Sequence, residues 1–142
     1  MKFSGQGLAP GSGSGAVAAI APLSFWGGYD PETGLVIDRH HPAHGRSLAG
    51  TVLVMTSGRG SSSSSTVLAE AIRLKTAPVA IVLAESDPIL VVGAMVAEAL
   101  YGRRCPIVVL SRADYDRVAG SYTAEVIADG GAGSVVTPDL PR

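Results

Sequence analysis

The middle of the chain alternates between short apolar runs and longer segments with helical spacing. Short apolar runs bounded by turn residues are typical of buried strands, and apolar residues three to four positions apart are typical of helices. The pattern predicts strands over Thr51–Met55, Val79–Ala84 and Pro106–Leu110, and helices from the serine run to Lys75, over Ile89–Leu100 and from Ser111 to Val118.

Shorter β-rich pieces flank this alternation. We expect strands over Gly15–Ile20 and Leu35–Asp38, separated by a turn over Asp30–Gly34, and final strands over Val126–Ala128 and Ser134–Thr137. Strands that alternate with helices favour a parallel sheet. We therefore predict an α/β fold with a parallel component, and with the short β pieces packed beside it.

The composition narrows the class of protein. The 142 residues suffice for one domain, which we expect to span 1–142. Charged residues make up 16% of the chain, against about 25% in an ordinary domain, which suggests that a partner covers part of the surface. The net charge of −1 offers no basic field for nucleic acid, so we expect no nucleic-acid partner.

No membrane or disulfide signal stands out. The apolar run Ile89–Leu100 is too short to span a bilayer, and Ala16–Leu23 is a poor signal peptide because it is short and contains Pro22. We expect no membrane association and a cytoplasmic location. The single cysteine, Cys105, excludes a disulfide framework or a Cys-based cluster held by this chain alone, and we interpret it as a core residue.

The segment from Gly58 to Ser63, with the sequence GRGSSS, stands between an apolar strand and a predicted helix. Glycines let consecutive N–H groups converge, and a helix start adds partial positive charge, so the segment is suited to bind an anion. It lacks the spacing of a Walker A loop or a dinucleotide fingerprint. The alternative is a serine-rich helix cap, although five serines exceed what one cap needs.

Three other features have open roles. His40, His41 and His44 lie in one loop, where they could form a polar turn or contribute to a metal site, and nothing in the sequence places them near Ser61. We interpret the aromatic segment Leu23–Asp30, which holds three of the seven aromatic residues, as part of the core, with an interface anchor as the alternative. Asp87 before Pro88 is typical of a helix start rather than of a catalytic acid.

Taken together, these motifs resemble a known family. The stretches PLSFWGGYDPETGLVIDRHHPAHGRSLAGTVLVMTSGRGSSSSS (Pro22–Ser65) and TAPVAIVLAESDPILVVGAMVAEALYG (Thr76–Gly102) are similar to the small subunit of aconitase X, the swivel-domain branch of the aconitase superfamily. The resemblance is strongest over 15–110. It implies a swivelling β/β/α domain that closes over the active site of a hydro-lyase.

The resemblance also implies roles for the loop and for a partner. The family base is the first serine after the glycine of the GRG or GKG loop, which is Ser61 here, and the neighbouring Arg59, Gly60, Ser62 and Ser63 would bind substrate. A large subunit would carry the iron–sulfur cluster, so this chain would ligate no metal and would be active only as part of a heterodimer or larger assembly.

Two substrates fit the resemblance. Family members dehydrate cis-3-hydroxy-L-proline, giving 1-pyrroline-2-carboxylate, or mevalonate 5-phosphate. Nine Arg against two Lys indicate a GC-rich bacterial genome, which favours the hydroxyproline activity expected in bacterial members. A phosphate-bearing substrate would call for more cations than Arg59. The remaining alternatives are a non-catalytic swivelling binding module and a phosphate carrier, against which the lack of a loop His counts.

Overall fold

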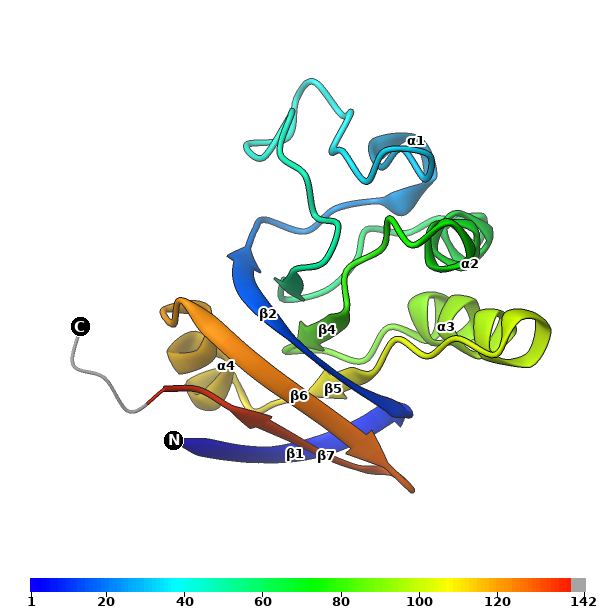
Figure 1. The fold of residues 1–142 in the computed structure, drawn as a ribbon. Coiled ribbons are helices and arrows are strands. Elements are labelled where there is room, and N and C mark those ends of the chain that lie inside the picture. Colours follow the sequence, from blue (N-terminus) through cyan, green and yellow to red (C-terminus); the bar gives the residue numbers. More distant parts are fainter. Residues whose placement is uncertain (139–142) are drawn as a thin grey trace.

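In the described part of the chain, seven strands close into a barrel with helices on its outside (Figure 1). The computed structural model describes residues 1–138. The strand order around the barrel is β1-β5-β4-β3-β2-β6-β7. Along the chain the elements are β1 (Lys2–Ala9), β2 (Gly11–Ala19), α1 (Phe25–Gly28), β3 (Val52–Val54), α2 (Ser64–Leu74), β4 (Ala80–Leu83), α3 (Pro88–Tyr101), β5 (Ile107–Val109), α4 (Arg112–Ala119), β6 (Thr123–Asp129) and β7 (Ala132–Val136).

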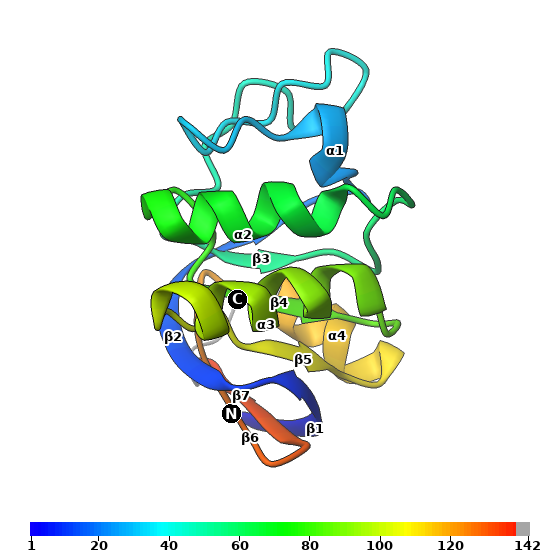
Figure 2. The same ribbon diagram turned by 90° about the vertical axis from the view of Figure 1, so that its right-hand side faces the viewer.

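The predicted parallel component is confirmed. β2, β3, β4 and β5 are parallel neighbours, and the remaining pairs of the barrel are antiparallel. α2 and α3 follow β3 and β4 and lie side by side, while α4 lies on the other side of the strands (Figures 1 and 2). Parallel neighbours connected by helices share one direction, so the loops that follow β3 and β4 emerge at the same edge.

Alternate residues of the central strands enter two separate cores. Leu53 and Ile81 belong to the cluster under α2 and α3, with Leu68 of α2 and Leu90 of α3. Their neighbours along the strands, such as Val52, belong to the barrel cluster with residues of β6, β7 and α4. Because both faces are covered, β3 and β4 are buried along their whole length, which explains why their sequences show no polar alternation.

The helix boundaries follow the predicted signals. Asp87 caps α3 by accepting from the N–H groups of Ile89 and Leu90, and Gly102 ends that helix in a left-handed conformation. α4 begins after Ser111, whose hydroxyl accepts from the N–H of Asp114. Within residues 1–138, no helix is both long enough and apolar enough to cross a membrane.

The first strand was predicted too short. The expected strand began at Gly15, whereas β1 and β2 occupy almost all of the first 19 residues. Alternate glycines made this stretch resemble a loop. A Cβ at Gly13 would lie 2.5 Å from the carbonyl oxygen of Val79, and one at Gly15 would lie 2.6 Å from that of Gly50. These glycines therefore allow close backbone approach within the sheet.

The strand predicted over Leu35–Asp38 was wrong. Only isolated bridges form there, between Tyr29 and Val36 and between Leu35 and Ser47, so the region is irregular. The preceding turn is confirmed: the N–H of Gly34 donates to the carbonyl of Asp30 at 2.8 Å, and Gly34 has a φ of 79°. The two final strands are confirmed but longer than expected, as a hairpin of β6 and β7 that turns at positive-φ glycines.

Gly93 allows α2 and α3 to pack closely. A Cβ at this position would lie 2.7 Å from the carbonyl oxygen of Ser65 and 3.2 Å from Cβ of Leu68. We expect Gly93→Ala to lower the free energy of unfolding by about 1–3 kcal/mol, since overpacking outweighs the gain in helix propensity. Chemical denaturation measures the change.

Gly120→Ala is the matched control. Gly120 ends α4 with a φ of −86°, and the nearest atoms to an added Cβ are 3.6 Å and 3.8 Å away. The midpoint of denaturation of Gly120→Ala should equal or exceed that of the wild type. Equal stability of Gly93→Ala and Gly120→Ala would contradict the close-packing argument.

Candidate functional site

The loop between β3 and α2 is held to its surroundings at both ends. The N–H of Gly58 donates to Oδ2 of Asp87 at 3.1 Å, and the N–H of Arg59 donates to the carbonyl of Leu23 at 3.2 Å. At the helix end, the N–H of Ser64 donates to the carbonyl of Ser61 at 3.0 Å. These contacts fix the backbone on either side of the segment between Arg59 and Ser64.

The segment between those contacts exposes unpaired donors. Within the described part of the chain, the N–H groups of residues 60–63 have no hydrogen-bond partner. They precede the first turn of α2, where the helix dipole favours a negative charge. Arg59 is exposed beside them. Unpaired donors and a nearby cation are what an anion-binding loop would need, and anion binding stays a prediction.

The five serines have different roles. The buried hydroxyl of Ser64 accepts from the N–H of Trp26 at 3.0 Å, and the hydroxyl of Ser65 donates to the carbonyl of Ser62 at 2.9 Å. Ser63 stands at the N-cap of α2 without a capping hydrogen bond. Ser61 is half-buried, and among residues 1–138 its hydroxyl has no hydrogen-bond partner. The hydroxyls of Ser64 and Ser65 thus bond within the protein, whereas among the described residues those of Ser61, Ser62 and Ser63 have no hydrogen-bond partner.

The histidine loop lies closer to this site than the sequence indicated. A cavity of about 420 Å³ brings it to the start of the GRGSSS loop, and its lining consists of Ala21, Pro22, Asp38, His40, His41, Pro42, Ser57 and Arg59. Contact between segments 38–42 and 57–59 depends on tertiary packing, which spacing along the chain does not reveal. His44 does not line this cavity; it lines a neighbouring one.

His41 has a structural role. Its Nδ1 accepts from the N–H of Ala43 at 2.9 Å, so the proton is on Nε2, which donates to the carbonyl of Ala21 at 2.8 Å. His40 is exposed at the cavity. Within the described residues, no three His, Cys, Asp or Glu side chains are grouped to hold a metal ion.

The aromatic segment divides between core and surface. Phe25 and Tyr29 are buried and stack with ring centroids 4.7 Å apart, which confirms the core plug for these two. The Tyr29 hydroxyl donates to the carbonyl of Thr76 at 2.6 Å, and burial raises its pKa. Trp26, in contrast, is 59% exposed next to the serine loop. Of the aromatic segment, Trp26 is therefore at the surface beside the loop, and Tyr29 is in the core.

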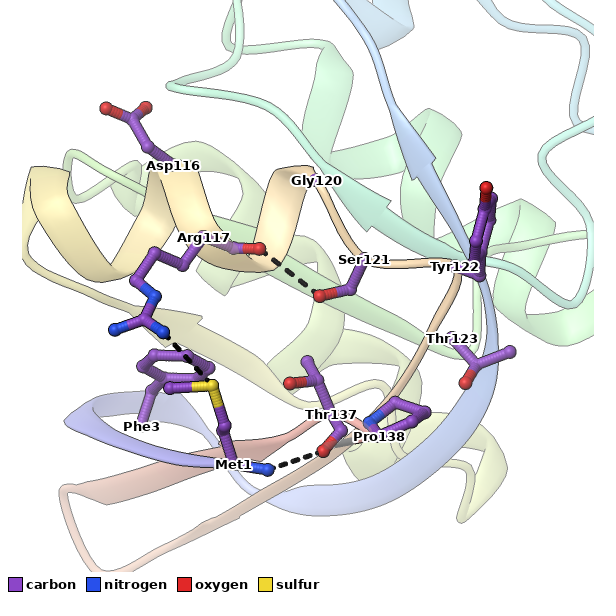
Figure 3. A pocket seen from close by; sticks show the side chains of 10 residues that line it. All are labelled: Met1, Phe3, Asp116, Arg117, Gly120, Ser121, Tyr122, Thr123, Thr137 and Pro138. Carbon is purple, nitrogen blue, oxygen red and sulfur yellow. Dashed lines mark hydrogen bonds between the residues drawn. The ribbon is translucent and has the colours of Figure 1, made fainter. Parts of the chain in front are cut away.

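A second cavity lies away from the loop. It measures about 530 Å³ and is formed by the chain start, α4 and the strands beside them (Figure 3). Arg117 contacts the Met1 sulfur there, and Ser121 donates to the carbonyl of Arg117. None of its lining residues belongs to the loop, so it is separate from the candidate site.

The fold and the loop together correspond to a known family. Residues 2–136 match the family described as the aconitase X swivel domain. The chain belongs to this family. Crystallographic aconitase X from Thermococcus kodakaraensis, in its holo form, contains a chain that superposes with a TM-score of 0.79 at 32% identity, covering 96% of this chain and 98% of that one. The swivel-type α/β fold expected from the sequence is confirmed.

Named relatives fall into two groups. A cis-3-hydroxy-L-proline dehydratase from Pseudomonas aeruginosa is 49% identical over 87% of this chain, which spans only 21% of that protein. A phosphomevalonate dehydratase small subunit from Methanothermobacter thermautotrophicus is 45% identical over 63% of this chain and 70% of its own length. This chain therefore corresponds to about a fifth of the first relative and to most of the second.

The residues of this chain do not fit an iron–sulfur cluster. Its one cysteine, Cys105, is buried in the core under α2 and α3, where its thiol contacts the carbonyl of Pro78 at 3.5 Å. Burial raises the pKa of this thiol to about 12, which disfavours the thiolate that a metal requires. This chain by itself therefore could not hold such a cluster.

Cys105 should resist thiol reagents in the folded chain. With its pKa raised, the thiolate stays scarce at about pH 8, and burial blocks access. We expect no labelling by an aromatic disulfide reagent under native conditions and complete labelling in denaturant. Rapid native labelling, followed by absorbance, would show that the helix layer opens readily.

Proposed function

We propose that this chain is the small, swivelling part of an aconitase X-type dehydratase, with Ser61 as the proton acceptor. The observation that carries the proposal is the half-buried Ser61 hydroxyl, which lacks a protein partner in the described residues and lies three residues before the first residue of α2. The larger part of the enzyme would hold the iron–sulfur cluster and close against the exposed face around Trp26.

Ser61 needs help to act as a base, because a serine hydroxyl normally holds its proton. Unpaired N–H groups, the N-terminus of α2 and the nearby Arg59 would stabilise its alkoxide form as a preorganised anion site. The alkoxide would take the proton from the carbon next to the substrate carboxylate, and the hydroxyl on the following carbon would leave. Arg59, Gly60, Ser62 and Ser63 would orient the substrate.

The proposed substrate is cis-3-hydroxy-L-proline, converted to 1-pyrroline-2-carboxylate. Two relatives named for this activity align with 87% and 94% of the chain, at 49% and 40% identity. Arg59 lines the cavity of about 420 Å³ next to the loop, and among the described residues no other lining side chain carries a permanent positive charge. One cation suits a single carboxylate.

Mevalonate 5-phosphate is the second candidate substrate. It is favoured by the separate-subunit relatives, since the phosphomevalonate dehydratase small subunit of Methanothrix thermoacetophila aligns over 77% of its own length and 74% of this chain. The purified assembly, offered each compound in turn, decides between them. We expect turnover of cis-3-hydroxy-L-proline only; turnover of the phosphate ester alone would reverse the assignment.

Ser61→Ala should abolish turnover without disturbing assembly. Removing a general base typically slows a reaction by about 10²- to 10⁴-fold, so kcat should fall by that factor. Steady-state kinetics measure turnover, and size-exclusion chromatography measures assembly with the large partner.

Ser14→Ala is the matched control, because Ser14 is an exposed serine on β2, outside the loop. It should keep wild-type turnover. If the Ser61→Ala enzyme retains full kcat, the proposed role of Ser61 as the base is wrong.

A further inference from the structure

We propose that Asp87 is a positioning residue that holds the GRGSSS loop in its working conformation. This inference rests on the proposed function, because it assigns Asp87 to the loop that presents Ser61. The sequence indicated only a helix start at this position, and that prediction is confirmed. The structure adds a second role, carried by the other oxygen of the same carboxylate.

The two carboxylate oxygens of Asp87 serve different elements. Oδ1 accepts from the N–H of Ile89 at 3.0 Å and from that of Leu90 at 3.2 Å, which caps α3. Oδ2 accepts from the N–H of Gly58 at 3.1 Å, 29 residues earlier in the chain. A cap needs one acceptor, so the bond to Gly58 exceeds what α3 requires.

The contact is possible because β3 and β4 are parallel neighbours. Val54 at the end of β3 pairs with Val82 of β4, so the loops after both strands emerge together. In Figure 2 the starts of α2 and α3 lie at the same end of the helix layer. The Asp87 carboxylate therefore bridges the start of α3 to the loop that leads into α2.

The contact requires a residue without a side chain at position 58. A Cβ at Gly58 would lie 2.4 Å from Oδ2 of Asp87, so a side chain there would displace the carboxylate. The next residue, Arg59, is held on another side by Leu23. With two successive N–H groups directed outward to fixed acceptors, the chain enters the Ser61 turn from a defined direction. Loss of the Gly58 contact would leave Ser61 on a loosened loop.

Asp87→Asn separates the two roles of this residue. Asn caps helices as well as Asp does, but its side chain has a single acceptor oxygen, which cannot serve both α3 and Gly58. Asp87→Ser is the second variant, since Ser also caps well but its short hydroxyl cannot span to the loop. Both variants should keep α3 and release Gly58.

Amide hydrogen exchange on the full chain measures the protection of each of these hydrogen-bonded amides separately. In the wild type, the amides of Gly58, Ile89 and Leu90 should all be protected. In both variants the Gly58 amide should exchange at least about tenfold faster, while the amides of Ile89 and Leu90 stay protected. With the large partner present, kcat should fall by about 10- to 100-fold, with a smaller change in KM, because a misplaced group costs about that much.

Ser111→Ala controls for helix capping alone. Ser111 caps α4 through a bond to the N–H of Asp114, away from the loop. This variant should lose the thermal stability that the cap of α4 contributes, and its kcat should stay unchanged. An equal fall of kcat in Ser111→Ala would show that general destabilisation, not loop position, explains the Asp87 variants.

The inference fails if Gly58 stays protected in both Asp87 variants, or if its amide is released while kcat stays at the wild-type value. It fails independently of the proposed base. Should Ser61→Ala retain turnover while the Asp87 variants lose both Gly58 protection and kcat, the positioning role stands and the base must be another group in the loop.

Discussion

The parallel pairing of β3 with β4 is the constraint on which the candidate site depends. Two parallel neighbours release their following loops at one edge of the sheet, so the GRGSSS loop after β3 meets Asp87 after β4. The helices that start from these loops then pack side by side, with Gly93 allowing their close approach. The site is therefore assembled where two helix N-termini converge.

The small share of charged residues in this chain has two structural explanations, one in its buried strands and one on its surface. Part of it comes from strands that are buried on both faces and from glycines in β1 and β2 that permit close backbone contact. The surface also carries large apolar side chains: Trp26 next to the loop and Met95 on α3 are more than half exposed. Large apolar side chains in such positions support the larger partner that we propose.

Much of the site could be predicted because its signals are local. Glycines followed by serines between an apolar strand and an amphipathic segment indicate an anion-binding loop, and Asp87 before Pro88 marks a helix start. Other features involve residues far apart in sequence. The sequence did not show that Ser64 is an acceptor for Trp26, that the His40 loop borders Arg59, or that residues 2–14 form strands.

By itself, the sequence determined the order of strands and helices in the middle of the chain, the helix caps, the family and the loop that carries Ser61. These properties depend on apolar periodicity, turn chemistry and short motifs, all of which act over a few residues. Only the tertiary structure decided that the strands close into a barrel, that two of five serines are structural and that Asp87 reaches Gly58. The barrel, the bond from Trp26 to Ser64 and the bond from Gly58 to Asp87 depend on groups brought together across tens of residues, which no local pattern encodes.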